Sequence, residues 1–258
     1  MKNINHVIAD CLQSHFEFPP GFCLQDGVYG GLVLAVATAR IEAQAAHPIR
    51  SLQLNFCALA RANLPTRCEV EQMRKGTKTE TYAVSLYQGD VCVAHGCAFT
   101  GRSRASMDDA LFLKCPDVAP VERVPVIDPG LPLPPYTQHF AMQPCIGDMI
   151  LSGTHPVSGG YLSFTDPAVS HYQSAHLGAL IDAWWPSFFV TATKMRPMAT
   201  TSIQVNYTSA DEPMASEPVL LEVKGQVVSG GFGSEINLLW SQDGRLLASA
   251  HQCIAIIA

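Results

Sequence analysis

An internal repeat constrains the fold of this chain more than any other feature. The segment SLQLNF at residues 51–56 matches SIQVNY at residues 202–207 at every position, by identity or by close similarity. These segments start 151 residues apart, and a second match follows downstream, where AHGC at 94–97 corresponds to AHQC at 250–253 with a spacing of 156. Similar spacings at two places indicate that the chain contains two copies of one structural unit.

Both copies have the same predicted order of elements. In the first, a mostly buried helix runs from Tyr29-Gly30-Gly31 to Ala46, after a short strand near 15–18, and is followed by strands near 51–56, 68–74, 80–87 and 91–99. In the second, a helix from about His171 to Phe189 precedes strands near 200–208, 218–229, 234–241 and 245–257. The fold is therefore predicted to be α+β, a tandem (double) hotdog. Two long helices would each be wrapped by a curled antiparallel sheet of about five strands, and the two sheets would be continuous.

A proline-rich stretch separates the two copies. Hydrophobic periodicity disappears over residues 101–135, and seven of the 18 prolines lie between Pro116 and Pro135. Such a segment is typical of a linker that crosses the surface. The predicted organisation is an N-terminal hotdog at 1–105, a linker at 106–135 and a C-terminal hotdog at 136–258.

Composition narrows the choice of partners and compartment. Only 15% of the residues are charged, below the roughly 25% usual for soluble domains, so a homo-oligomer that hides apolar surface is expected. The net charge of −6 argues against nucleic acid and anionic membranes as partners. No apolar run is long enough to span a bilayer, the N-terminus lacks the apolar core of a signal peptide, and the nine scattered cysteines suit a reducing compartment. A cytoplasmic location is expected.

One acid stands in the most apolar helical stretch of the chain. Asp182 lies within LIDAWWP, residues 180–186, between Leu180 and Ile181 on one side and two tryptophans on the other. Trp184 and Trp185 are interpreted as core or interface residues. Burying a carboxylate without partners is costly, so Asp182 is expected to be neutralised, bound to donors or placed in a site that uses its charge.

Several stretches in order resemble the double-hotdog acyl-CoA thioesterases of the thioesterase II type: YGG at 29–31, GYLSF at 160–164, LIDAWWP at 180–186, residues 200–207 and LASAHQ at 247–252. This resemblance implies an acyl-CoA substrate and a triad of Asp on the second helix, Ser or Thr at the start of the next strand and Gln on the last strand. Those positions hold Asp182, Thr200 and Gln252. Thr201 stays open as a substitute for Thr200, because strand alternation places Thr201 on the face of the apolar Ile203.

The repeat supports this choice of residues independently. At the spacings above, Gln252 corresponds to Gly96 and Thr200 to Ile49, and alignment of Gly178 with Gly31 sets Asp182 opposite Ala35. A structural requirement of the fold should occur in both copies, whereas a single catalytic site needs each group once.

These residues fit the chemistry of thioester hydrolysis. Asp182 is the candidate base, and Thr200 and Gln252 would hold the attacking water. Backbone N–H groups of Gly30 and Gly31, at a helix N-terminus, would bind the developing oxyanion or the substrate. No metal or other cofactor is required, and the His-x-Cys segments at 95–97 and 251–253 supply two ligands each, short of a tetrahedral zinc site.

Two alternatives belong to other classes of function. A hotdog hydratase or dehydratase acting on enoyl or 3-hydroxyacyl thioesters would need a histidine working with an acid, and His171 and His176 lie on the predicted second helix. A non-catalytic module that binds acyl thioesters would need only the pocket.

Overall fold

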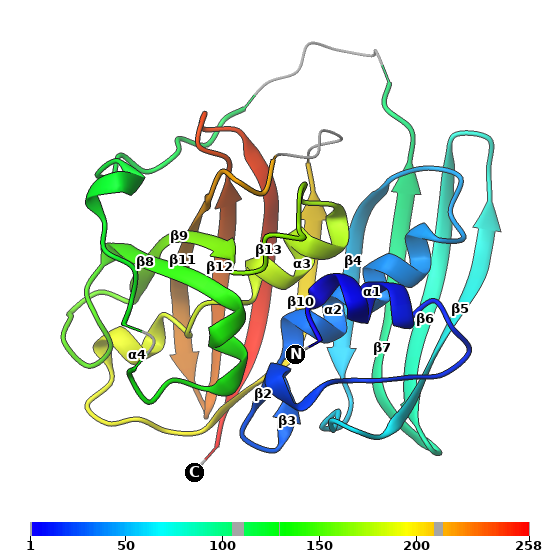
Figure 1. The fold of residues 1–258 in the computed structure, drawn as a ribbon, viewed down its shortest axis with the longest axis horizontal. Coiled ribbons are helices and arrows are strands. Elements are labelled where there is room, and N and C mark those ends of the chain that lie inside the picture. Colours follow the sequence, from blue (N-terminus) through cyan, green and yellow to red (C-terminus); the bar gives the residue numbers. More distant parts are fainter. Residues whose placement is uncertain (1, 105–110, 129, 209–213, 258) are drawn as a thin grey trace.

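A single antiparallel sheet of eleven strands runs through the molecule, with the order β1-β5-β6-β7-β4-β10-β13-β12-β11-β9-β8. The structure is a computed structural model that describes residues 2–104, 111–128, 130–208 and 214–257. Helices α2 and α3 contact each other and lie on one face of the sheet (Figure 1). The predicted continuity of the two sheets is confirmed, since β4 of the first half pairs with β10 of the second.

The first half follows the prediction closely. The helix α2 and the four predicted strands are present, although the helix ends at Glu42, four residues before the predicted end. Residues 31–39 of this helix are buried, as its uninterrupted apolar sequence requires. The elements are α1 (Ile4–Asp10), β1 (Phe16–Glu17), β2 (Cys23–Leu24), β3 (Gly27–Val28), α2 (Gly30–Glu42), β4 (Ile49–Phe56), β5 (Pro65–Lys75), β6 (Thr79–Gln88) and β7 (Val91–Gly101).

The second half contains the four predicted strands and two that the pattern did not locate. Strands β8 and β9 precede the helix, and two glycines and a proline interrupt their alternation of apolar and polar residues. The elements are β8 (Phe140–Gly147), β9 (Val157–Phe164), α3 (Ser174–Ile181), α4 (Phe188–Thr191), β10 (Met198–Tyr207), β11 (Val219–Ser229), β12 (Phe232–Trp240) and β13 (Leu246–Ile256).

The second helix is much shorter than the predicted span of 171–189. Helix α3 has eight residues against the 13 of α2, and Asp182 is its C-cap, with φ −109° and ψ 7°. Pro186 explains the difference, because proline has no N–H to donate and disfavours the helical conformation in the residue before it. The expectation of two long helices is therefore wrong for the second half. None of the helices in the described ranges is long and apolar enough to cross a membrane.

A local two-fold axis passes through the junction of the two halves. Gln53 in β4 lies directly opposite Gln204 in β10, and these two residues are equivalents at the spacing of 151. The pairs on either side are exchanged by the same operation, because the pair of Leu52 with Val205 maps onto the pair of Ile203 with Leu54. Beside the axis the apolar residues Leu52, Leu54, Ile203 and Val205 are buried under the helices. Gln53 and Gln204 are exposed on the outer face.

The strand register corrects one part of the sequence alignment. Leu52 lies opposite Ala98, and Ile203, its equivalent, lies opposite Gln252, so the counterpart of Gln252 is Ala98 and the true spacing is 154. The match of His95 with His251 was therefore two residues out of register.

The helices are also offset from the predicted alignment. They start at Gly30 and Ser174, which sets Asp182 level with Thr38 rather than Ala35. The conclusion that neither the carboxylate nor the amide occurs in the first half still holds at these corrected positions.

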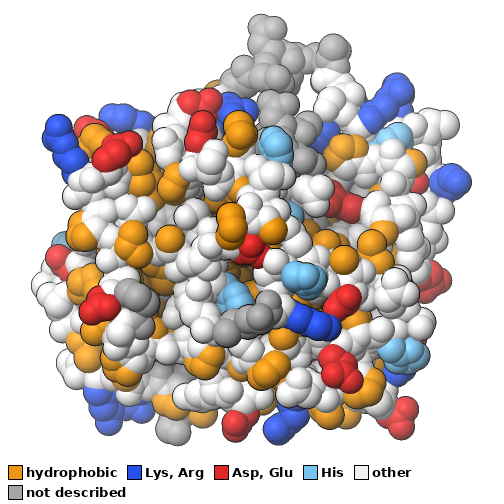
Figure 2. Space-filling view, in the orientation of Figure 1, with side chains coloured by type: hydrophobic (Ala, Val, Ile, Leu, Met, Phe, Trp, Pro, Cys, Tyr) orange, Lys and Arg blue, Asp and Glu red, His pale blue; other side chains and the backbone are white. Residues whose placement is uncertain are grey.

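Part of the proline-rich segment covers the outer face of the second half. Gln143 donates from Nε2 to the carbonyl oxygens of Val121 and Val124 at 2.9 and 2.6 Å, and the Tyr161 hydroxyl donates to Ala119 O at 3.0 Å. Val124 and the fully buried Trp240 belong to one apolar cluster there. Residues 106–110 and 129 of the predicted linker lie outside the described residues, and the domain boundaries stay predictions. On the face drawn in Figure 2, side chains of both charges are interspersed with apolar ones.

The junction predicts a contrast between neighbouring substitutions in β4. Leu52→Ala removes a fully buried side chain beside the local two-fold and should lower the free energy of unfolding by about 2–5 kcal/mol. The exposed neighbour Gln53→Ala should change it by no more than about 0.5 kcal/mol. Urea unfolding followed by circular dichroism measures both, and equal losses would contradict the assigned faces.

Candidate active site

A bulge at the start of β10 decides which threonine faces the helices. Thr200 lies opposite Ile254 and Ser202 opposite Cys253, so Thr201 is the extra residue. Because a bulge shifts the alternation of side chains by one, Thr200 joins the inward face of the strand. The Thr201 hydroxyl instead donates to the carbonyl oxygen of Cys253 at 3.0 Å. A register shift at the equivalent place in β4, between residues 49 and 51, shows that the irregularity belongs to the repeated unit.

Three side chains predicted from the sequence form one chain of hydrogen bonds. Thr200 donates from Oγ1 to Gln252 Oε1 at 3.2 Å, and Gln252 donates from Nε2 to Asp182 Oδ1 at 2.8 Å. They come from β10, β13 and the C-terminal end of α3. Gln252 is only 2% exposed, whereas Thr200 and Asp182 are partly exposed. Solvent therefore reaches both ends of the chain of hydrogen bonds, while its centre is fixed within the core.

The N-terminus of α2 lies against the Asp182 carboxylate. The backbone N–H of Gly31 donates a hydrogen bond to it. A Cβ atom at Gly30 would lie 2.7 Å from Asp182 Oδ2 and 3.2 Å from Phe56 Cζ, so a larger residue at this position would displace the acid. The positive end of the helix dipole stabilises the ionised carboxylate, and glycine is what allows the contact.

Burial and hydrogen bonding act on Asp182 in opposite directions. Burial raises its pKa to about 7, while the hydrogen bonds from Gln252 and Gly31 lower it. A carboxylate with a pKa near neutrality suits a general base, because it is largely ionised at neutral pH and still basic enough to take a proton. Tyr29 and Tyr136 stack beside the site with ring centroids 4.6 Å apart, and burial together with the charge of Asp182 raises the pKa of both phenols.

Two residues that the sequence did not reveal hold the segment that follows α3. Asn237 donates from Nδ2 to Ile181 O at 2.9 Å, and Glu235 Oε2 accepts from the Ser187 N–H at 3.0 Å and from its hydroxyl at 2.9 Å. Together they fix both ends of residues 182–186. The only sequence signal for them was that both residues occupy alternate positions of β12 whose side chains point toward the core. Burial, the largest cause, and the charge of Asp182 raise the pKa of Glu235 to about 7.

The remaining residues of this region have structural partners. Trp184 is buried in the main core and Trp185 packs against it, which confirms their interpretation as core residues. His176 accepts from the Gln173 N–H at 3.2 Å through Nδ1 and bonds to Asn5 Oδ1 at 2.8 Å through Nε2. Burial lowers its pKa to about 4, so the ring is neutral with both nitrogens occupied.

The other histidines weighed from the sequence lie at the surface. His171 is exposed before α3 begins, outside the helix on which it was predicted. His95 and His251 are also exposed, and they bond to Ser85 Oγ and Gln226 Oε1, each at 2.9 Å. In the part of the chain that the structure describes, no three His, Cys, Asp or Glu residues are grouped so that they could hold a metal ion.

Most of the sequence matches two models of one protein family. Residues 18–101 match the family described as "Acyl-CoA thioesterase N-terminal domain", and residues 114–256 match "Acyl-CoA thioesterase C-terminal domain". No curated protein matches the sequence significantly.

Solved structures share the fold at low sequence identity. A hot dog fold protein of unknown function from Alicyclobacillus acidocaldarius is 22% identical over 98% of both chains, with a TM-score of 0.85. A putative thioesterase II from Thermobifida fusca is 18% identical over 95% of this chain and 92% of that one, with a TM-score of 0.78. An acyl-CoA thioesterase II from Mycobacterium marinum is 15% identical over 97% and 98%, with a TM-score of 0.74.

The raised pKa of Asp182 predicts a pH-dependent stability. Since the folded-state pKa of about 7 exceeds the ordinary value of 3.8, the folded protein holds a proton that the unfolded chain releases, and stability falls as the pH rises between these values. Asp182→Asn removes this loss and should raise the free energy of unfolding by on the order of 2 kcal/mol near pH 8, with a smaller gain near pH 5. Urea unfolding of both proteins across this range measures the effect. A difference that is independent of pH would contradict the assignment.

Proposed function

This chain belongs to the acyl-CoA thioesterase family, and from that premise we propose that it hydrolyses an acyl-CoA to free acid and CoA through a water that Asp182 deprotonates. The family match makes the chain a thioester hydrolase and confirms the resemblance inferred from its sequence. The observation that carries the mechanism is the chain of hydrogen bonds from Thr200 through Gln252 to Asp182.

The proposed reaction balances without a cofactor. The oxygen of water attacks the thioester carbonyl carbon while Asp182 takes one of its protons. The tetrahedral intermediate then expels the CoA sulfur, the C–S bond breaks, and the proton passes from Asp182 to the thiolate. A thiol with a pKa near about 8.5 leaves with little help from an acid. This explains how a site with one carboxylate, one amide and one hydroxyl suffices.

The direction of each hydrogen bond in the triad indicates what the residues around Asp182 do in the proposed reaction. The Thr200 hydroxyl hydrogen points to Gln252, so the Thr200 oxygen is left to accept a hydrogen bond from the attacking water. Gln252 joins Thr200 to Asp182 and retains its second Nε2 hydrogen as a donor. Because the Gly31 N–H is directed at the carboxylate, we assign the oxyanion to the N–H of Gly30, the first residue of α2. Gly31 acts by holding Asp182.

Replacement of the base should abolish turnover. Asp182→Asn is expected to lower kcat by at least about 100-fold, since the variant cannot take the proton of the attacking water. Thiol release from a panel of acyl-CoA substrates, followed with a thiol reagent, measures the loss, and circular dichroism checks the fold. In the wild type, kcat/KM should fall as the pH drops below about 7, where Asp182 becomes protonated. Unchanged turnover in a folded variant would refute the mechanism.

Alanine substitutions of the two adjacent threonines provide a test variant and its matched control. Thr200→Ala removes a hydroxyl that donates to Gln252 and should lower kcat about tenfold or more, since the attacking water loses its acceptor and the amide oxygen of Gln252 loses its donor. Thr201→Ala removes a hydroxyl bonded only to the Cys253 carbonyl among the hydrogen bonds of the described residues, and should leave kcat within about twofold. Greater loss in the second variant would exchange their roles.

A further inference from the structure

The outer face of the sheet, which points away from α2 and α3, is nearly free of charge across its centre. Six neighbouring strands, β6, β7, β4, β10, β13 and β12, form this centre, and the structure describes all of their residues. Only three charged residues occur in them. Glu80 and Glu235 are buried on the inner face, and Arg50, at the start of β4, is bonded through Nε to the Gly101 carbonyl oxygen at 2.8 Å. The outward side chains are amides, hydroxyls, thiols, histidines and apolar groups.

Charged side chains begin on the strands that flank this centre. On β5, next to β6, Arg67 and Glu69 form an ion pair at 2.8 Å. On β11, next to β12, Lys224 and Glu222 form another at 2.7 Å. An uncharged centre with a charged rim is typical of a protein–protein interface, since the core of such an interface is depleted of charged residues.

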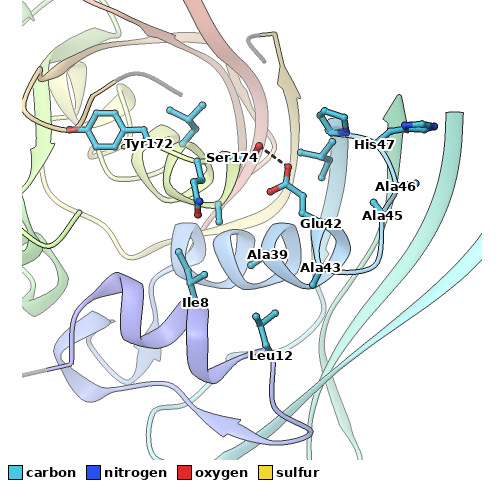
Figure 3. A pocket seen from close by; sticks show the side chains of 15 residues that line it. Ile8, Leu12, Ala39, Glu42, Ala43, Ala45, Ala46, His47, Tyr172 and Ser174 are labelled. Carbon is cyan, nitrogen blue, oxygen red and sulfur yellow. Dashed lines mark hydrogen bonds between the residues drawn. The ribbon is translucent and has the colours of Figure 1, made fainter. Parts of the chain in front are cut away.

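The opposite side of the molecule differs in this respect. Figure 2 shows side chains of Lys, Arg, Asp and Glu across the side on which the helices lie. On that side Figure 3 shows a cavity of about 520 Å³ between α1 and the last turn of α2, where the Glu42 carboxylate accepts from Ser174 Oγ at 2.8 Å. The lack of charge is therefore a property of the outer face and not of the whole surface.

The polar groups at the centre of the outer face can pair with copies of themselves. The local two-fold axis passes between Gln53 and Gln204, and on each side of this pair a serine lies opposite an asparagine. Amides and hydroxyls both donate and accept hydrogen bonds, so a second copy of the same row can satisfy them. A charged side chain at the centre of a symmetric contact would instead meet the same charge.

The dimensions of this face suit a stable dimer. Strands lie about 4.8 Å apart and rise about 3.3 Å per residue, so six strands of roughly eight residues cover about 750 Å². Each partner contributes about 800 Å² to an interface of standard size. Beside the axis, Gln53, Gln204 and Phe99 line a hollow of about 170 Å³, which is large enough for an aromatic ring. Phe99 itself is 41% exposed.

We propose that the outer face is the interface of a homodimer in which the sheets of two copies of this chain pack back to back. The dimer axis lies between the two sheets and parallel to them, so the pair of Gln53 with Gln204 in one copy meets the same pair in the other. A buried centre of this kind accounts for the low share of charged residues, 15% of the chain. The inference is independent of the proposed reaction, because Gln252 and Asp182 lie on the helix side of the sheet.

Sedimentation equilibrium of the full chain tests the proposal. The wild type is expected to sediment at twice the mass of one chain. Gln204→Glu and Gln204→Lys each place a like charge on both copies at the centre of the interface, and each should weaken self-association by at least about 100-fold. An equal mixture of the two variants should restore the dimer, since opposite charges then face each other. This recovery distinguishes a lost interface from a misfolded chain.

Ala9→Glu is the matched control. Ala9 is exposed on α1, on the helix side, so the same charge placed there should leave the mass unchanged. Circular dichroism checks that each variant is folded. A dimer that is lost in each Gln204 variant and regained in their mixture supports the proposal. A monomeric wild type, Gln204 variants that stay dimeric, or a loss that the mixture does not reverse would overturn it, and a monomer would leave the outer face to a partner of another kind.

Discussion

The contact between the Asp182 carboxylate and its donors is the interaction on which the rest of the site depends. Burial alone would favour the neutral acid, as the pKa of about 7 shows, and the hydrogen bonds from Gln252 and the Gly31 N–H oppose that tendency. Each donor imposes a demand on the fold. Gln252 must be fully buried in β13, and residue 30 must lack a Cβ so that the helix N-terminus can reach the acid. The two halves of the chain are therefore joined at the site as well as at the sheet.

Holding this carboxylate at the end of α3 changes the second half relative to the first. In the first half, α2 continues to Glu42 and a short loop reaches β4, whereas α3 stops at Ile181 and a longer segment, including α4, leads to β10. The freed backbone needs new partners, which Asn237 and Glu235 supply at the two ends of residues 182–186. The buried Glu235 is tolerated near the Asp182 carboxylate because Glu235 accepts hydrogen bonds from both the backbone N–H and the hydroxyl of Ser187.

The sequence predicted the duplicated fold because SLQLNF and SIQVNY lie at the local two-fold itself, where both copies have the same surroundings. The sequence alignment placed Gln252 two residues out of register, because it followed the chance match of His95 with His251. The correct register becomes visible only from the strand pairing. A shift of two keeps a side chain on the same face of a strand, so the inference about Gln252 survived. The bulge at Thr201 and the contacts of Glu235 depend on neighbours that are distant in sequence, and alternation within one strand contains no information about them.

A two-fold arrangement offers two equivalent places, and among the described residues only the place at Asp182 holds the carboxylate, amide and hydroxyl that the proposed mechanism needs. The triad buries an amide and partly buries a carboxylate, which destabilises the fold unless every group is bonded. In the first half, Ile49 and Ala98 bury apolar surface at the corresponding positions, which stabilises the shared sheet. That contribution offsets the cost of burying Asp182 and Gln252 in the other half. Because both halves share one sheet, apolar burial at one position contributes to the free energy of unfolding of the whole molecule, so the polar residues at its counterpart are tolerated.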